Sequence, residues 1–204
     1  MPLLMFIRHG ENDYVKEQKL AGRLPGVHLN EAGRKQASLL AQALADFKVK
    51  AIYSSPLDRA IETAQPISSI LNLPINISDD LIEVDFGDWT GQGLKQLRKD
   101  ALWKMVQQFP SLMRFPNGES FVEAQFRVCS LVEKKCKEYK PKDIILCISH
   151  SDVIKLAVVY YIGLGLDYFQ RIQISPSSIT TLSIQKSGSI LVNLNHLSHE
   201  LSRD

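Results

Sequence analysis

Several short apolar runs, each bounded by polar or turn-forming residues, predict the strands of a buried sheet. Runs of this length are too short for a globular helix. Strands are therefore expected at residues 3–7, 50–53, 76–77, 143–148, 179–185 and 190–194. The last two runs flank residues 186–189, whose Lys-Ser-Gly-Ser sequence predicts a hairpin turn.

Between the early strands, apolar residues recur at spacings of three and four, which predicts amphipathic helices. Asn30 is the expected N-cap of the first helix. Ser55 is the expected N-cap of the second, because Pro56 follows at the first helical position. Pro66 lies inside the second pattern and predicts a kink or an early break there.

The second half of the chain contains three more helical patterns. Residues 94–109 predict one helix, and residues 153–162 predict another after the clearest strand. A long helix is expected after Gly118. Its buried side is expected to hold Val122, Phe126, Cys129, Val132, Cys136 and Tyr139.

Strands that alternate with helices predict an α/β fold with three α/β/α layers and a mostly parallel central sheet. Residues 81–118 do not follow the alternation and are rich in Gly, Asp and Pro. We expect them to form a small, lid-like helical insertion over one end of the sheet. The whole chain, residues 1–204, is then expected to form a single domain.

Composition and charge exclude some classes of protein. The 204 residues are 45% hydrophobic and 23% charged, which is ordinary for a globular chain and wrong for a disordered one. The net charge of +2 is too balanced to favour nucleic acid or an anionic membrane surface as a partner. No pattern in the sequence indicates an oligomeric state.

Cysteine and histidine spacing favours neither disulfides nor a metal site. Cys129, Cys136 and Cys147 form no CxxC pair, and the histidines lack zinc-site spacing. No cofactor or metal is therefore expected, and His28, His196 and His199 are interpreted as surface residues. The sequence shows no signal peptide and no apolar run long enough to span a membrane, which predicts a cytoplasmic protein.

Basic residues follow three of the predicted strands. Arg8 and His9 follow the first, Arg59 lies shortly after the second, and His150 follows the strongest. The carboxyl ends of parallel strands share one edge of a sheet, where α/β proteins bind ligands. Guanidinium groups bind phosphate bidentately, and nearby cations keep a histidine neutral and nucleophilic. This pattern favours a phosphate-binding enzyme.

Arg8, His9 and Arg59 lie in segments that resemble the histidine phosphatase superfamily, which includes phosphoglycerate mutase. The matching segments are R-H-G-E at 8–11, L-N-E-A-G-R-K-Q-A at 29–37, S-P-L-D-R-A-I-E-T-A at 55–64, and L-I-E-V-D-F-G-D-W-T-G at 81–91. A G-E-S sequence at 118–120 also occurs in the family. Taken together and in this order, the segments are a specific signal.

The resemblance implies a role for each matching residue. His9 would be the nucleophile that becomes phosphohistidine, and Arg8, Arg59 and His150 would hold the phosphoryl group. Glu83 would be the general acid that protonates the leaving alcohol and then the base that activates water. Asp85 is an alternative for that role.

Three positions near the expected substrate differ from the family pattern. Ser151 follows the second histidine, where the family often has glycine. Gly22 keeps the glycine of a Thr-Gly pair, but Ala21 replaces the threonine. Val15 stands where the family often has asparagine, and Asn12 is expected to substitute for it. Asn12, Gly22 and Ser151 are thus the predicted substrate-binding residues.

The resemblance implies a metal-independent phosphatase that hydrolyses small phosphate monoesters. A phosphomutase of the phosphoglycerate type is the alternative, although such enzymes usually carry a longer insertion after the catalytic acid. A third possibility is a non-catalytic module that binds a phosphorylated ligand. Apolar residues of the insertion are expected to shape the leaving-group pocket and to favour bulky or aromatic esters: Trp89, Leu94, Trp103, Met105, Phe109, Met113 and Phe115.

Overall fold

The computed structural model of the chain describes residues 2–185 and 188–197, and in this part the strands form one sheet in the order β3-β2-β4-β1-β5-β6. The parallel strands are β1 (Leu3–Arg8), β2 (Val49–Ser54), β3 (Ile75–Ile77) and β4 (Ile144–Ser149). The antiparallel strands at one edge are β5 (Ile179–Gln185) and β6 (Gly188–His196). The predicted α/β class with a mostly parallel sheet is confirmed.

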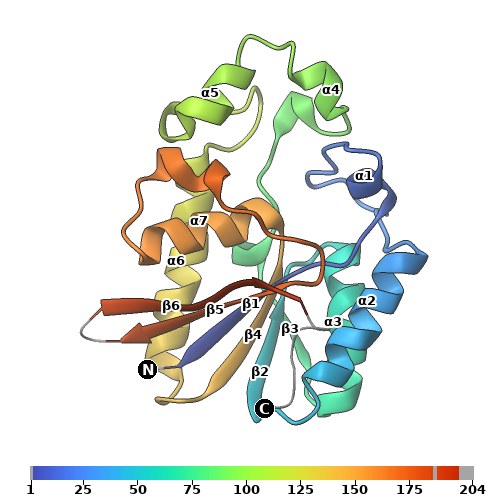
Figure 1. Ribbon diagram of the computed structural model, residues 1–204, viewed down its shortest axis with the longest axis vertical. Coiled ribbons are helices and arrows are strands. Elements are labelled where there is room, and N and C mark those ends of the chain that lie inside the picture. The colour runs from blue at the N-terminus through green and yellow to red at the C-terminus, as the bar shows by residue number, and fades with distance from the viewer. Residues whose placement is uncertain (1, 186–187, 198–204) are drawn as a thin grey trace.

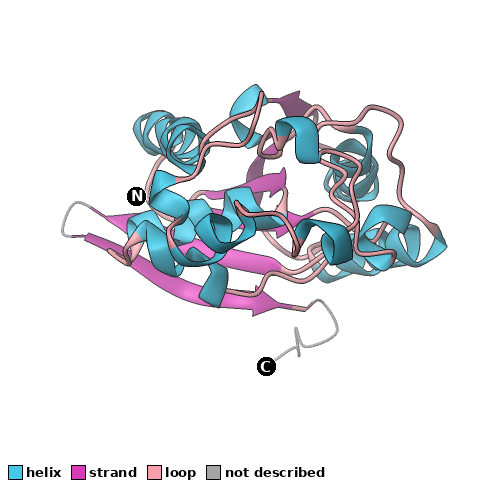
Figure 2. Cartoon of the chain, turned by 90° about the horizontal axis from the view of Figure 1, so that it is seen from above, coloured by secondary structure: helices cyan, strands magenta, loops and turns pink. Residues whose placement is uncertain are grey.

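Helices pack on both faces of this sheet, as Figures 1 and 2 show. One face carries α2 (Glu31–Ala43) and α3 (Asp58–Leu71). The other face carries α6 (Phe121–Glu138) and α7 (Ser151–Tyr161). Alternating residues of the central strand β1 serve the two layers: Leu4 and Phe6 pack with α6 and α7, whereas Met5 and Ile7 pack with α2 and α3.

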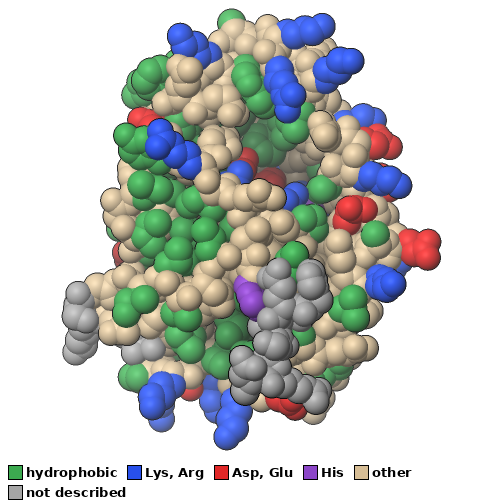
Figure 3. Space-filling model, viewed as in Figure 1, with side chains coloured by type: hydrophobic (Ala, Val, Ile, Leu, Met, Phe, Trp, Pro, Cys, Tyr) green, Lys and Arg blue, Asp and Glu red, His purple; other side chains and the backbone are tan. Residues whose placement is uncertain are grey.

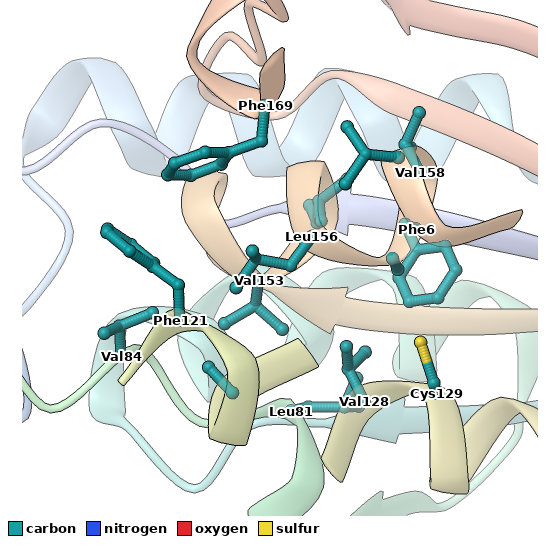
Figure 4. Close-up of a cluster of buried hydrophobic side chains, with 14 of the residues drawn as sticks. Phe6, Leu81, Val84, Phe121, Val128, Cys129, Val153, Leu156, Val158 and Phe169 are labelled. Atoms are coloured by element: carbon teal, nitrogen blue, oxygen red, sulfur yellow. The ribbon is translucent and has the colours of Figure 1, made fainter. Parts of the chain in front are cut away.

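The larger core lies between the sheet, α6 and α7 (Figure 4). Phe6, Phe121 and Phe169 are fully buried there, and the rings of Phe121 and Phe169 lie 4.7 Å apart. Each such side chain contributes about 1.5–3 kcal/mol by leaving water. This packing anchors β1 and β4, the two strands that carry the histidines predicted to be functional.

Of the two N-caps predicted from the sequence, the one of α2 is confirmed and the one of α3 is wrong. The Asn30 side chain caps α2 by accepting a hydrogen bond from the backbone N–H of Gly33, as expected. Ser55 does not cap α3: its N–H donates to the carbonyl of Ile148 in β4, and its hydroxyl lies 2.8 Å from the ring of His150. The helix begins three residues later, after Leu57.

The expected break at Pro66 is also wrong. Helix α3 continues through the proline and ends at Asn72, whose φ of 51° is left-handed. Ala64 and Ile67, on either side of Pro66, are both fully buried against the sheet. Proline has no N–H to donate within the helix, and the free energy gained by this packing is larger than the cost of the lost hydrogen bond.

The insertion lies above the carboxyl-terminal edge of the sheet, at the top of Figure 1. It follows η1 (Asp79–Leu81) and consists of short elements: η2 (Gly87–Trp89), α4 (Leu94–Leu97), α5 (Trp103–Gln108) and η3 (Pro110–Leu112). The single helix predicted over 94–109 is therefore wrong. Asp100 divides it, because its carboxylate accepts the backbone N–H of Leu102 and its carbonyl accepts that of Trp103, so a new helix begins.

The buried face of α6 differs from the predicted one. Val122 and Phe126 are 49% and 75% exposed, while the residues that pack inward include Phe121, Ala124, Val128 and Cys129. The observed buried face is rotated about the helix axis relative to the predicted one. The capping box of Ser120 and the buried Phe121 ring fix the orientation in which the helix begins. Cys129 and Val132 are buried as predicted.

The remaining described elements are the short helix α1 (Asp13–Lys16), beside the insertion in Figure 1, and η4 (Leu166–Arg171), which packs on α7. Gln185 and Gly188 pair at the end of the β5–β6 hairpin, and residues 186–187 of the predicted turn lie outside the described part, as does His199. His28 is exposed, as expected. No helix among the described residues is both long and apolar enough to cross a membrane.

Candidate active site

The predicted functional residues meet at the carboxyl-terminal edge of the sheet. Strands β1 and β4 are in register up to Arg8 and Ser149, so His9 and His150 leave the sheet side by side. Their ring centroids lie 5.1 Å apart. Arg59 reaches the same place from the first turn of α3, which follows β2. The crossover connections of a parallel sheet are the physical reason for this convergence.

The His9 ring is buried and held in one orientation. Its Nδ1 lies 2.7 Å from the carbonyl oxygen of Gly10, which can only accept, so Nδ1 carries the proton and Nε2 presents a lone pair. The Thr63 hydroxyl accepts the Gly10 N–H and donates to the carbonyl of Arg59. Burial, followed by the charges of Arg59 and Arg8, holds the pKa of His9 well below its usual range.

Glycines are required where this loop crosses the start of α2. A Cβ atom at Gly10 would lie 2.7 Å from the carbonyl oxygen of Gly33. A Cβ atom at Gly33 would lie 2.0 Å from the carbonyl oxygen of Glu11. The close crossing fixes the backbone on which His9 stands, and no larger residue fits at either position.

Each of the two arginines has one end held by the protein and another end free. Arg8 donates from Nη1 to the carbonyl of Ile174 at 2.6 Å, and Arg59 donates from Nη2 to the carbonyl of Gly22 at 2.7 Å. Arg8 Nε and Arg59 Nε and Nη1 are buried but have no hydrogen-bond partner in the described structure. Buried donors of this kind are costly unless a ligand accepts their hydrogen bonds.

Asn12 and His150 contribute two more free donors. Asn12 is fully buried; its Oδ1 accepts the N–H of Val15, and its Nδ2 has no partner among the described residues. The Nε2 of His150 lies 2.8 Å from the hydroxyl of Ser55, which also accepts the N–H of Leu57. Ser55 is therefore free to donate to Nε2, which leaves the proton of a neutral His150 on its unpartnered Nδ1.

Glu83 extends from the segment after η1 into the same site. Its Oε2 lies 3.9 Å from His150 Nδ1, and its Oε1 accepts the backbone N–H of Val84. The residue is 9% exposed. Burial is the largest cause that raises the pKa of Glu83 to about 7; the charge of Asp152 adds to it, while Arg59 opposes it. A carboxyl group with this pKa can both donate and accept a proton near neutral pH.

The structure separates Glu83 from its alternative, Asp85. The Asp85 side chain is 39% exposed and does not line the cavity. It accepts the N–H of Gly87 and lies 3.9 Å from Arg23 instead. Asp152, which sequence reasoning did not single out, does line the cavity and pairs with Lys155. Its position directly after His150 and Ser151 was the available signal.

Gly22 and Ser151 also line the cavity, but they differ in what they do there. Gly22 has a φ of 52°, and its carbonyl holds Arg59. A Cβ atom at Gly22 would lie 2.9 Å from Thr90 Oγ1. Ser151 is the first residue of α7 and is partly exposed.

Two adjoining cavities lie between the sheet edge and the insertion, and Figure 3 shows the hollow with charged side chains at its base. The inner cavity, of about 200 Å³, contains Arg8, His9, Arg59 and Glu83. The outer cavity, of about 290 Å³, is mainly apolar. The two share Leu20, Phe86, Leu94 and Asp152.

Some of the predicted pocket residues line the outer cavity and others do not. Trp89, Leu94, Trp103 and Phe115 line it, and the rings of Trp89 and Trp103 are stacked 6.1 Å apart. The other three members of the predicted set lie elsewhere: Met105, Phe109 and Met113. Phe109 is 45% exposed and Met113 is buried in the core. No group of histidine, cysteine, aspartate and glutamate side chains in the described residues could hold a metal ion.

A family model described as the histidine phosphatase superfamily (branch 1) matches residues 4–197. The chain belongs to this superfamily. Phosphoserine phosphatase 1 from Hydrogenobacter thermophilus is 28% identical to this histidine phosphatase, over 98% of the chain and 94% of the relative. A putative phosphoserine phosphatase 2 from the same organism is 31% identical, over 98% of both chains.

Solved structures agree with this assignment. The phosphoserine phosphatase of Entamoeba histolytica in complex with 3-phosphoglyceric acid has a TM-score of 0.88 at 27% identity, over 98% of this chain and 99% of its own. A mycobacterial glucosyl-3-phosphoglycerate phosphatase has a TM-score of 0.87 at 25% identity, over 95% and 99%. The protein is thus a phosphoric monoester hydrolase, of a superfamily that works through phosphohistidine.

Proposed function

We propose that His9 is the nucleophile of this phosphatase and that Arg8, Arg59, His150 and Asn12 hold the transferred phosphoryl group. The observation that carries this assignment is the set of buried, unpartnered N–H donors on these four residues, within the described structure, around a histidine with a free Nε2. A dianionic phosphate would accept those hydrogen bonds, most of them charge-assisted. Each donor would otherwise remain desolvated without a partner.

In the first half-reaction His9 Nε2 attacks phosphorus and the bond from phosphorus to the ester oxygen breaks. Glu83 gives its proton to the departing oxygen, so the product leaves as a neutral alcohol. The pKa of about 7 keeps a large fraction of Glu83 protonated for this step. The free donors of Arg8 and Arg59 stabilise the charge on the phosphoryl oxygens in the transition state.

In the second half-reaction a water molecule attacks the phosphohistidine. Glu83, now a carboxylate, takes the proton of that water while the bond between Nε2 and phosphorus breaks. Phosphate leaves, His9 is again neutral, and Glu83 is again protonated. The same donors serve both halves, because the phosphoryl group stays in place while the leaving group is exchanged for water.

The outer cavity supports a leaving group with an apolar or aromatic body. A leaving group on the phosphoryl oxygen would pass Leu20, Phe86 and Leu94, which line both cavities, and reach Trp103. The named relatives act on phosphoserine or glucosyl-3-phosphoglycerate, so these esters belong in any test. We infer a substrate class of monoesters larger than a triose acid.

Trp103→Ala is expected to raise the KM for 1-naphthyl phosphate about 5- to 20-fold, while the KM for the smaller glycerol phosphate changes little. The reason is that the variant removes part of the apolar wall of the outer cavity. Initial rates over a range of both esters measure the effect. Phe109→Ala is the matched control, because Phe109 is an exposed aromatic of the same insertion that lines neither cavity. Equal KM changes for both esters in Trp103→Ala would contradict the assignment.

Asp152→Asn is expected to move the alkaline limb of the pH profile of kcat/KM to lower pH. Burial raises the pKa of Glu83 first, and the charge of Asp152 raises it further, so the substitution lowers this pKa. Glu83 then loses its proton at a lower pH and can no longer act as the acid. The facing groups Arg8, Arg59 and His150 are unchanged by the substitution. A limb that stays in place, or moves to higher pH, would contradict the role of Asp152.

The proposed function is tested by rapid quenching with p-nitrophenyl phosphate in EDTA, followed by intact-mass analysis. We expect turnover and one acid-labile phosphoryl group on the chain. A panel of phosphoserine, 3-phosphoglycerate and 1-naphthyl phosphate then defines the substrate class. A bisphosphate-primed assay for conversion of 3-phosphoglycerate to 2-phosphoglycerate tests the mutase alternative, and efficient conversion without phosphate release would overturn the proposal.

A cytoplasmic location remains part of this proposal. Its support is that Cys129, Cys136 and Cys147 are all free thiols. Free cysteines are typical of a reducing compartment. Fractionation of cells that produce the protein, with thiol labelling before lysis, would test the location.

A further inference from the structure

We infer that Glu119 is a positioning residue for the general acid, and that it acts by holding two arginines on the backbone carbonyl of Glu83. The inference rests on the proposed function, in which Glu83 is that acid. Glu119 belongs to the G-E-S sequence at 118–120, which has no role in the candidate active site so far. The arrangement is called the carbonyl clamp below and consists of Glu119, Arg23 and Arg127.

The carbonyl of Glu83 is the centre of the clamp. Arg23 donates to it from Nε at 2.8 Å, and Arg127 donates to it from Nη2 at 3.3 Å. The two arginines come from different parts of the chain: Arg23 from the loop after α1, and Arg127 from the second turn of α6. Two charged donors on one carbonyl restrict the rotation of the Glu83 peptide, and therefore the direction in which its side chain leaves the backbone.

Glu119 holds both arginines in place. Its carboxylate accepts from Arg127 Nε at 2.8 Å and Nη2 at 3.1 Å, and from Arg23 Nη2 at 3.0 Å. It also accepts the backbone N–H of Asp85 at 3.2 Å, two residues beyond Glu83. The Glu119 side chain is 13% exposed and that of Arg127 is 15% exposed. Bidentate pairing at such low exposure has the geometric specificity that surface ion pairs lack.

The clamp also reaches the other wall of the cavity. Arg23 follows directly on Gly22, whose carbonyl holds Arg59 Nη2. The same carboxylate therefore connects the segment that carries the acid to the loop that orients a phosphate-binding arginine. In addition, Arg127 donates to the carbonyl of Asp80 at 2.8 Å, which holds the chain just before Glu83. The acid is thus fixed on both sides of its own position.

A group that is placed about 1 Å from its productive position costs up to about 100-fold in rate. If Glu119 positions Glu83, the loss of rate is expected in the step in which Glu83 protonates the leaving oxygen. Phenyl phosphate and p-nitrophenyl phosphate separate this loss from a general one, because they are similar in shape but differ in how strongly the leaving oxygen needs a proton. Phenolate is the stronger base, so its departure depends on Glu83 far more than that of p-nitrophenolate does.

The test measures kcat and KM of Glu119→Gln for both esters. Glutamine keeps the shape but offers only one acceptor oxygen and no charge to the two arginines. We expect kcat/KM for phenyl phosphate to fall about 10- to 100-fold and kcat/KM for p-nitrophenyl phosphate to fall much less, because kcat/KM depends on the half-reaction in which the ester oxygen leaves and not on the hydrolysis of phosphohistidine that both esters share. Glu138→Gln is the matched control, since it removes an ion-paired glutamate at the far end of α6. It is expected to change kcat/KM for neither ester.

The double variant Glu83→Gln/Glu119→Gln decides whether the clamp acts through the acid. If it does, the double variant is no slower than Glu83→Gln alone, because there is no acid left to position. Additive losses, or equal losses on both esters in Glu119→Gln, would overturn the inference. If Glu83→Gln itself does not discriminate between the esters, the assignment of Glu83 as the acid is wrong. Should Glu119→Gln fail to fold, as judged by circular dichroism, Arg23→Ala tests the same clamp with the same expected discrimination.

Discussion

His9→Ala is expected to lose turnover of every phosphate monoester by on the order of 10⁴-fold or more, because the substitution removes the proposed nucleophile. The loss follows from the geometry of His9, whose Nδ1 is committed to Gly10 and whose Nε2 is free. Steady-state rates with p-nitrophenyl phosphate and intact-mass analysis after an alkaline quench, in which a phosphohistidine survives, measure it. The phosphoryl adduct that the wild-type chain forms should be absent.

Two measurements keep the interpretation of His9→Ala specific. His28→Ala removes an exposed histidine that pairs with Glu62 of α3 and lines neither cavity, and it should retain full activity. Calorimetry with inorganic phosphate should still detect binding to His9→Ala, since the donors of Arg8 and Arg59 remain. A phosphoryl adduct that persists in His9→Ala would show that another group is the nucleophile.

Glu83→Gln is expected to lower kcat/KM about 10²- to 10⁴-fold for phenyl phosphate and alkyl esters, and much less for p-nitrophenyl phosphate, because kcat/KM depends on the half-reaction in which the ester oxygen leaves. Glutamine can occupy the same space and accept the Val84 N–H, but it has no proton to give to a strongly basic leaving oxygen. The alkaline limb of the pH profile, which Glu83 with its pKa of about 7 should produce, is expected to disappear in this variant.

Asp85→Asn is the comparison that separates the two candidate acids. Asp85 lies two residues away, is 39% exposed and does not line the cavity. It should therefore show a far smaller loss, and the same loss on both aryl esters. If Asp85→Asn discriminated between phenyl and p-nitrophenyl phosphate while Glu83→Gln did not, the roles of the two residues would have to be exchanged.

The parts of the site that lie close to strand ends were predictable from the sequence. Arg8 and His9 directly follow the apolar run of β1, and His150 directly follows that of β4. A buried parallel strand has a clear sequence pattern, and the chain direction then determines which edge its last residue reaches. The motifs around these residues, including the one that contains Arg59, identified the superfamily for the same reason: they are local.

Two predictions failed for different reasons, one because packing overrode a local pattern and the other because a local side-chain hydrogen bond ended a helix. Pro66 favours a helix break, but the burial of Ala64 and Ile67 keeps α3 continuous. Residues 94–109 have a helical pattern, but the Asp100 carboxylate accepts the backbone N–H of Leu102 and divides the segment into two helices. Local preferences amount to a few kcal/mol at most, and tertiary contacts of similar size decide between them.

What the sequence by itself determined about this protein is the order of its strands and main helices, its superfamily, and the residues that meet at the sheet edge and are proposed to hold the phosphoryl group, because each is written in a short segment. Only the tertiary structure favoured Glu83 over Asp85, since Glu83 is buried in the cavity, where burial and the charge of Asp152 raise its pKa, whereas Asp85 is 39% exposed and does not line the cavity. Likewise, only the folded chain brings Arg23, Glu119 and Arg127 together, because contacts between segments far apart in sequence leave no periodic pattern.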